Sequence, residues 1–198
     1  VVEPVCLQCG RPQPAATDAC QLCSQTPLPL HQIRTATFYE GPVAEVIKQF
    51  KYEGYFGLAN PLAKLMLEAW PRWEQPVDLV VPIPLHAARQ RERGYNQSEL
   101  LARALEHELN WQVEPAALKR VRRTRPQVGL NMAERQTNVQ GAFVAEPTFI
   151  MGKDILLVDD VRTTGATLVA AANVLLAAGA KSVSAYCLAG AGSNDQVS

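Results

Sequence analysis

The chain has 198 residues, of which 47% are hydrophobic and 19% charged, and its formal net charge is zero with a pI of about 7.0. At roughly 100–200 residues per domain, this length predicts one domain, or one domain with a small appendage. The composition excludes intrinsic disorder as the main description, because enough apolar residues are present to build a core. The apolar run over residues 168–180 is interrupted by Asn173 and is too short to cross a bilayer, and no signal-peptide pattern is found. We therefore expect a cytoplasmic protein without membrane insertion.

Four of the five cysteines form two C-x2-C pairs early in the sequence. Cys6 and Cys9 are separated by ten residues from Cys20 and Cys23, in a stretch with little apolar surface to bury. Two such pairs can place four thiolates around one Zn²⁺, in a structural site that leaves no coordination position open for chemistry. A disulfide framework is the alternative, but nothing else in the sequence indicates an oxidising compartment. We expect a zinc-binding knuckle over residues 1–30 and a larger domain over residues 31–198.

The first half of the larger domain combines strand-like and helix-like patterns. Residues 33–39 alternate as a strand does, whereas apolar positions in residues 42–52 and 58–70 have helical spacing. Residues 77–83 form a continuous apolar run that is typical of a buried strand. Asn96 is a suitable N-cap for an amphipathic helix over residues 97–109.

The second half continues this alternation. We expect strands at residues 117–121, 141–144, 155–158 and 182–188, a helix at residues 166–178, and a loop without clear period at residues 126–140. Strands that alternate with helices predict an α/β domain with a mainly parallel central sheet. Cys187 is expected to be a buried strand residue, and residues 190–192 a flexible tail.

Positive charge is concentrated in the middle of the chain. Ten of the 19 Lys and Arg residues lie between positions 86 and 138. Over residues 119–135 one acidic residue, Glu134, accompanies six cations, which are Lys119, Arg120, Arg122, Arg123, Arg125 and Arg135. Such a stretch suits phosphate groups. The solvated face of a strand and loop explains it equally well.

Residues 155–167 hold the densest chemical signal, an apolar strand followed by Asp159, Asp160 and a Thr-Thr-Gly-Ala-Thr turn. Ligands of parallel α/β sheets bind at the carboxyl ends of strands, and a helix that follows the turn directs its first N–H groups there. An anion site is therefore predicted at Thr163, Thr164, Gly165, Ala166 and Thr167. The two carboxylates would repel phosphate, so we expect them to serve sugar hydroxyls or a hydrated Mg²⁺. The alternative is that these residues only end a strand and cap the N-terminus of a helix. No Walker A or G-x-G-x-x-G sequence is present, which disfavours the usual nucleoside triphosphate and dinucleotide sites.

At these residues the chain resembles the phosphoribosyltransferases of the type I fold, whose signature is an apolar strand, two acidic residues and a similar turn. Further segments are similar to the ComF family, which also carries an N-terminal four-cysteine zinc knuckle. They are Val81-Pro82-Ile83-Pro84-Leu85-His86, Arg93-Gly94-Tyr95-Asn96-Gln97, and Thr124, Gln127, Arg135 and Asn138 before Gly141-Ala142-Phe143. The resemblance covers nearly the whole chain.

The resemblance implies an α/β phosphoribosyltransferase type I-like fold, a parallel sheet of about five strands flanked by helices, with phosphoribosyl pyrophosphate or a related sugar phosphate as ligand. Its 5′-phosphate would lie on residues 163–167, and Asp159 and Asp160 would hold the ribose hydroxyls as the catalytic carboxylates. His86 and Arg89 are the candidates for the pyrophosphate, which would carry Mg²⁺. Residues 122–138 correspond to the flexible lid of that fold.

The ComF resemblance further implies a role in natural competence, in the uptake and handling of single-stranded DNA with a helicase of the ComFA type. The candidate DNA contacts are Arg93, Arg120, Arg122, Arg123, Arg125 and Arg135. An active phosphoribosyltransferase with an unknown acceptor remains an alternative, as does a sensor that binds phosphoribosyl pyrophosphate without turnover.

Overall fold

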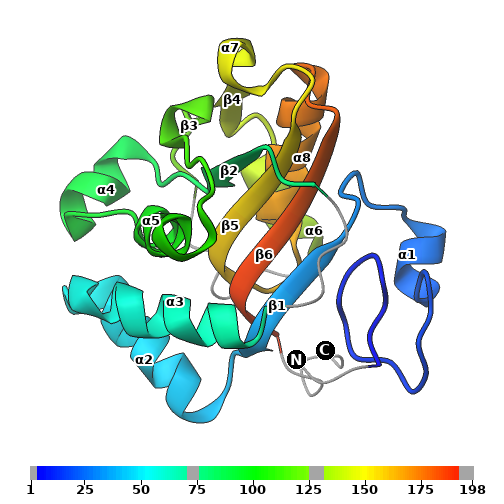
Figure 1. Ribbon diagram of the computed structural model, residues 1–198. Coiled ribbons are helices and arrows are strands. Elements are labelled where there is room, and N and C mark those ends of the chain that lie inside the picture. Colours follow the sequence, from blue (N-terminus) through cyan, green and yellow to red (C-terminus); the bar gives the residue numbers. More distant parts are fainter. Residues whose placement is uncertain (1–3, 71–75, 125–131, 192–198) are drawn as a thin grey trace.

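A four-stranded parallel sheet forms the centre of the computed structural model, which describes residues 4–70, 76–124 and 132–191, apart from the side chains of Met132, Ala133, Arg135 and Gln136 (Figure 1). Its strands are β1 (Ile33–Phe38), β2 (Leu79–Pro82), β5 (Asp154–Arg162) and β6 (Ser182–Gly190), in the order β1-β6-β5-β2. Leu157 is paired with Ala185 of β6 and with Val81 of β2, so β5 lies in the interior of the sheet. The expected mainly parallel α/β sheet is confirmed.

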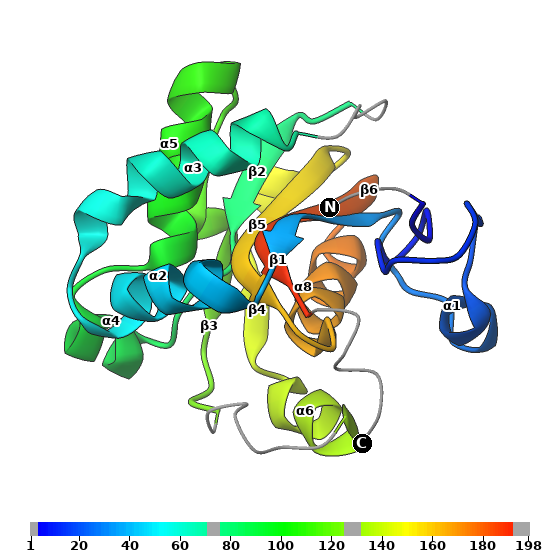
Figure 2. The same ribbon diagram turned by 90° about the horizontal axis from the view of Figure 1, so that it is seen from below.

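Helices cover both faces of this sheet (Figure 2). One face is covered by α2 (Gly41–Tyr52), α3 (Ala59–Glu68) and α5 (Gln97–Leu109). A short 3-10 turn, η1 (Phe56–Leu58), precedes α3. On the other face lies α8 (Ala166–Ala177). Because side chains of a strand alternate, Leu156 and Val158 join the core on the α2–α3–α5 side, whereas Ile155 and Leu157 join the core on the α8 side. Burial on both faces explains why the strands are continuous apolar runs.

A second, two-stranded antiparallel sheet lies beside the first. It pairs β3 (Leu118–Arg120) with β4 (Phe143–Ala145), and the 3-10 turn η2 (Pro115–Ala117) precedes it. The segment between its strands includes α6 (Met132–Val139), and α7 (Pro147–Ile150) follows β4. A short helix, α4 (Ala87–Arg93), comes directly after β2.

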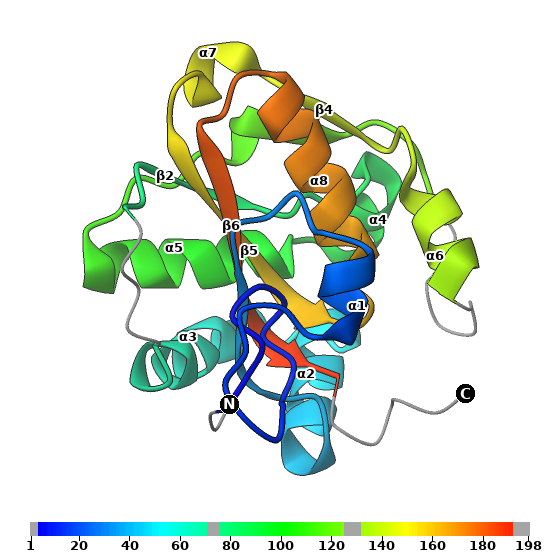
Figure 3. The same ribbon diagram turned by 90° about the vertical axis from the view of Figure 1, so that its right-hand side faces the viewer.

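The cysteine-rich segment packs against the edge strand β1 (Figure 3). It contains one short helix, α1 (Gln21–Gln25), and the backbone N–H of Ile33 donates to the carbonyl of Gln8 at 2.8 Å. Gly10 has a φ of +68°, and a Cβ at this position would lie 2.4 Å from the Ile33 carbonyl oxygen. Glycine is therefore required where the knuckle meets the sheet.

Three expectations about elements are wrong. β5 extends to Arg162 instead of ending before Asp159, because the two carboxylates have partners inside the protein that permit their burial. Residues 132–139 form a helix although they lack a regular apolar period. Gly190 is buried at the end of β6, and the N–H of Ala191 donates to the Arg162 carbonyl at 2.9 Å, so neither belongs to a free tail. Gly192 lies outside the described residues.

Candidate functional site

The two adjacent carboxylates lie side by side near the carboxyl end of β5, and both are buried. Asp159 is 8% exposed and its Oδ1 accepts a hydrogen bond from the hydroxyl of Ser98, at the start of α5, at 2.8 Å. Asp160 is 3% exposed and its Oδ2 lies 2.9 Å from the ammonium nitrogen of Lys51, in the last turn of α2. Three elements that are distant in sequence therefore meet at this point.

Charge compensation accounts for this burial. Burial, followed by the neighbouring charge of Asp160, raises the pKa of Asp159 to about 7. Burial acts to lower the pKa of Lys51, but the Asp160 carboxylate outweighs it, so the pKa of the lysine is raised. Lys51 is thus a resident cation beside the carboxylate pair.

The predicted anion site follows β5 directly. Residues 163–165 form the turn, and α8 begins at Ala166. Gly165 has a φ of +85°, which favours glycine, and the Thr164 hydroxyl accepts from the N–H of Ala166 at 3.3 Å. The structure therefore brings the turn of residues 163–165, the first residues of α8 and the carboxylate pair together at one end of the sheet.

A small hollow near the end of β2 is lined by basic side chains. Its lining residues are His86, Arg89, Arg120, Arg123 and Thr124. The side chain of Asn96 holds the strand end by donating to the Ile83 carbonyl at 3.0 Å, and the Nδ1 of His86 caps α4 by accepting from the Ala88 N–H at 3.2 Å. Arg89, a predicted pyrophosphate contact, lies on the helix α4.

Arg120 is the most constrained cation of this hollow. Its Nε is buried and has no hydrogen-bond partner among the described residues, while its guanidinium lies 5.3 Å from the centre of the Phe143 ring. Burial, followed by the charge of Arg89, lowers the pKa of Arg120. Two neighbouring guanidinium groups with an unused buried donor form a site that suits an anion.

The other predicted DNA-contacting arginines have separate roles in the structure. Arg93 stacks on the Tyr52 ring at 5.1 Å and donates to Gln97. Arg122 donates to the carbonyls of Asn138 and Gln140 at the end of α6, and Arg123 forms an exposed ion pair with Glu92 at 3.3 Å. Arg125 and the side chain of Arg135 lie outside the described residues.

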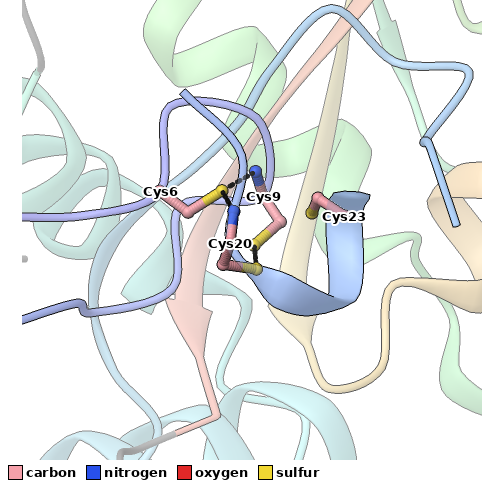
Figure 4. A group of neighbouring side chains, drawn as sticks. All are labelled: Cys6, Cys9, Cys20 and Cys23. Carbon is pink, nitrogen blue, oxygen red and sulfur yellow. Dashed lines mark hydrogen bonds between the residues drawn. The ribbon is translucent and has the colours of Figure 1, made fainter. Parts of the chain in front are cut away.

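The four cysteines of the knuckle converge on one point (Figure 4). Their Sγ atoms all lie within 4.8 Å of one another, all four residues are buried, and none forms a disulfide. Burial acts to raise the pKa of Cys6, but backbone N–H donors led by Cys9 and Cys20 outweigh it and lower the pKa to about 7. Burial raises the pKa values of Cys9 and Cys23. Four thiols this close fit a tetrahedral Zn²⁺ site, whose charge would stabilise all four thiolates.

Comparison with known proteins gives matches over most of the sequence. Residues 93–197 match the phosphoribosyl transferase domain family. The chain is 34% identical to the DNA utilization protein YhgH of Escherichia coli K12 over 93% of this chain and 83% of that protein. It is 30% identical to competence protein F of Haemophilus influenzae, over 94% and 84%, and 30% identical to competence protein ComFC of Bacillus subtilis, over 93% and 77%.

The chain belongs to the ComF family. The chain contains the phosphoribosyl transferase domain, and the four-cysteine cluster that the sequence predicts is present in the structure. Among solved structures, one described as the allosteric regulatory enzyme of purine biosynthesis is 19% identical, with a TM-score of 0.45 over 67% of this chain and 25% of that one. In the described part of this ComF chain, no helix is long and apolar enough to cross a membrane.

Sequence reasoning missed three residues near the site of this ComF-family chain. Lys51 lies four positions after the buried Ile47 and therefore on the same, apolar face of α2. A cation on this face is a feature of the sequence that could have indicated a buried charge partner. Ser98 gave no comparable signal, because its partner Asp159 comes from a distant segment, and the burial of Arg162 could not be read from the sequence either. Cys187 is buried as expected, and burial raises its pKa well above the ordinary value.

Proposed function

We propose that this ComF-family protein binds phosphoribosyl pyrophosphate or a related sugar phosphate and acts in the utilization of DNA during natural competence, as a handler of single-stranded DNA. The observation that supports this ligand is the pair Asp159 and Asp160 near the end of β5, followed two residues later by the predicted anion site of residues 163–167. The names of the relatives, a DNA utilization protein and two competence proteins, support the cellular role. A helicase of the ComFA type is the proposed partner.

Each part of the ligand has a candidate site. The turn at Thr163, Thr164, Gly165, Ala166 and Thr167 would bind the 5′-phosphate, while Asp159 and Asp160 would accept hydrogen bonds from the ribose hydroxyls. His86, Arg89 and Arg120 would bind the pyrophosphate, because neither of these two arginines forms an ion pair with a described residue and the Nε of Arg120 has no hydrogen-bond partner among them. Bound Mg²⁺ would neutralise the pyrophosphate and make it a better leaving group.

Two forms of this function differ in chemistry. In an active transferase, the carbon–oxygen bond to pyrophosphate breaks at the anomeric carbon, and a nitrogen or oxygen of the acceptor forms the new bond there. The buried carboxylates Asp159 and Asp160 would stabilise the positive charge that develops on the ribose ring. In a sensor, the same contacts bind the ligand and no bond breaks.

The proposal is tested by isothermal titration calorimetry with phosphoribosyl pyrophosphate and with inorganic phosphate, in Mg²⁺ buffer. We expect the double variant Asp159→Asn with Asp160→Asn to bind phosphoribosyl pyrophosphate at least tenfold more weakly than the wild-type protein. Its affinity for inorganic phosphate should stay within about twofold of wild type, because phosphate has no ribose hydroxyl for the carboxylates to bind. Asp154→Asn is the matched control, because it lies at the opposite end of the same strand, paired with Lys181 at 2.7 Å. Equal losses for both ligands, or no binding by the wild-type protein, would contradict the proposed site.

Turnover is measured separately, as pyrophosphate release in the presence of a panel of nucleobases and of single-stranded DNA. If the wild-type protein releases more pyrophosphate than Asp159→Asn in the presence of any acceptor, the protein is an active transferase. Tight binding without release assigns the sensor form.

A further inference from the structure

The exposed aromatic side chains of the described residues are gathered at one place, the connection between α2 and α3. Tyr52, Tyr55 and Phe56 are 71%, 56% and 66% exposed, and every other exposed large hydrophobic side chain in the described part of the chain is non-aromatic. Aromatic rings gain much from burial, so three exposed rings within five residues are unusual. These three residues, the aromatic cluster, therefore have the character of a surface that binds another molecule.

Contacts with residues at the end of α4 hold the aromatic cluster in position. The guanidinium of Arg93, the last residue of α4, lies 5.1 Å from the centre of the Tyr52 ring. Phe56 packs edge-on against the half-buried Tyr95, with 6.4 Å between the ring centres. Because these rings are positioned within the protein, a partner that stacks on them has less conformational entropy to remove.

The aromatic cluster also adjoins the carboxylate pair. Lys51, whose ammonium pairs with Asp160 at 2.9 Å, directly precedes Tyr52 at the end of α2. Adjacent residues of a helix point in different directions, so the lysine is directed to the sheet while the tyrosine is exposed. The cluster thus lies beside the proposed sugar-phosphate site, and none of its residues belongs to that site.

Charge indicates which kind of partner fits. Figure 2 shows α4 beside the end of α2, and Glu92 of this helix pairs with Arg123 at 3.3 Å. The helix therefore connects the aromatic cluster with the exposed cations Lys119 and Arg123 of the basic segment. Single-stranded DNA has both complementary features, because its unpaired bases have π faces and its backbone is negatively charged. An apolar protein surface would complement the rings and leave these cations unmatched.

We propose that Tyr52, Tyr55 and Phe56 form a stacking platform for the unpaired bases of single-stranded DNA, in which Arg93 fixes the Tyr52 ring. Every base has a π face, so this contact tolerates any sequence. It adds an attraction that does not depend on phosphate charge, whereas the phosphate contacts of Lys119 and Arg123 do. The inference rests on the proposed handling of single-stranded DNA and does not require phosphoribosyl pyrophosphate to bind.

The test compares two strands with equal numbers of phosphates, an oligothymidylate and a strand of the same length with abasic sites in place of the bases. Fluorescence anisotropy measures the affinity of the full-length protein for each strand over a salt series. We expect wild type to bind the oligothymidylate about fivefold more tightly or better, the lower limit for one base stacked on an aromatic side chain. The slope of log affinity against log salt should be the same for both strands, because their charge is the same.

A double variant assigns this preference to the aromatic cluster. Tyr52→Ala with Tyr55→Ala should lose about fivefold or more in affinity for the oligothymidylate and stay within about twofold of wild type for the abasic strand. Tyr52→Phe with Tyr55→Phe retains both rings and should retain the preference. Met151→Ala is the matched control, because this side chain is also 71% exposed but lies before the start of β5, away from the cluster.

Equal affinity of the wild-type protein for the two strands would overturn the platform and leave DNA binding to the phosphate contacts. An alanine double variant that still prefers the oligothymidylate would also overturn it, since the bases would then stack elsewhere. If the wild-type protein bound neither strand, the proposed handling of DNA would itself be wrong, and the platform with it.

If the alanine double variant does not fold, Tyr55→Trp takes its place. Its tryptophan fluorescence, after subtraction of the wild-type signal, should be quenched by the oligothymidylate and not by the abasic strand, because only a stacked base contacts the ring. The same fluorescence with and without saturating oligothymidylate would overturn the proposal.

Discussion

Asp159 and Asp160 are adjacent in one interior strand, and side chains from two different helices interact with their buried carboxylates. Ser98 of α5 donates to the first carboxylate at 2.8 Å, and Lys51 of α2 pairs with the second at 2.9 Å. Each interaction spans a long sequence distance, so folding completes the carboxylate pair and attaches α2 and α5 to the sheet at the same time. The chemistry of the site and the packing of one helical layer therefore depend on the same contacts.

Replacing Lys51 should reveal this dependence. Lys51→Met leaves the buried Asp160 without its cation, and loss of one partner of a buried ion pair typically costs about 3–5 kcal/mol. We expect a loss of this order in urea unfolding, partly restored by Asp160→Asn in the same chain. Lys48→Met is the control, because its pair with Glu45 is exposed and worth about 0–1 kcal/mol. Equal effects of the two lysine changes would show that the buried pair is not important for stability.

The raised pKa of Asp159 predicts a pH dependence with a definite sign. The folded protein releases this proton at about pH 7, whereas an unfolded Asp releases it near 3.9. Between these values the folded state holds more protons, so the stabilisation is complete below about pH 4 and decreases as pH rises to 7, by at most about 1.4 kcal/mol per unit. Unfolding of wild type and Asp159→Asn from pH 4 to 8 measures the difference between them. A difference that is independent of pH contradicts the prediction.

At the scale of elements, periodicity predicted the strands and the long helices α2, α3, α5 and α8, but not the shorter helices α1, α4, α6 and α7. It failed where long-range contacts decide the structure. The sequence Asp159-Asp160 suggests the end of a strand, and only Lys51 and Ser98 explain why β5 continues to Arg162. Likewise, Arg122 binds carbonyls at the end of α6, a contact that cannot be read from the weak apolar period of residues 132–139.

The same distinction applies to the site. The cysteine spacing and the turn after β5 are local signals, so both could be predicted from the sequence. The sequence predicts Arg120 as one of the DNA contacts, whereas the structure places it in a hollow beside His86 and Arg89, the candidates for the pyrophosphate. Their grouping depends on how β3 lies beside α4, which local sequence does not determine.

The knuckle should behave as a metal-dependent element on a domain that folds without it. We expect about one zinc per chain, and Cys20→Ser should release it because three thiolates hold the ion less well than four. Circular dichroism should show that the larger domain stays folded, since its core clusters do not include these cysteines. Cys187→Ala is the control, since this buried cysteine lies outside the cluster and should leave the zinc content unchanged. Zinc-free wild-type protein with an ordered knuckle would contradict the prediction.

For the whole molecule, net charge limits any interaction with nucleic acid. The 19 cations are balanced by 19 anions, so long-range attraction to DNA is weak. The structure reduces the available cations further, because Arg120 is largely buried and Arg122 holds the end of α6. Lys119 and Arg123 remain exposed in and after β3, and they are the best candidates for phosphate contacts.

Single-stranded DNA binding should therefore be weak, non-specific and sensitive to salt. Each phosphate contact contributes about 0.7 to the slope of log affinity against log salt, so Lys119→Ala with Arg123→Ala should make the slope less steep by about 1.4. Sequence preference should not change, because phosphate contacts carry no base information. Fluorescence anisotropy over a salt series measures the slope, and Lys48→Ala with Lys64→Ala, exposed on α2 and α3, is the matched control. If both double variants reduced the slope equally, the effect would come from overall charge and not from these two residues. If the wild-type protein did not bind single-stranded DNA at low salt, intrinsic DNA binding would be excluded, and any DNA contact would have to come from a partner protein.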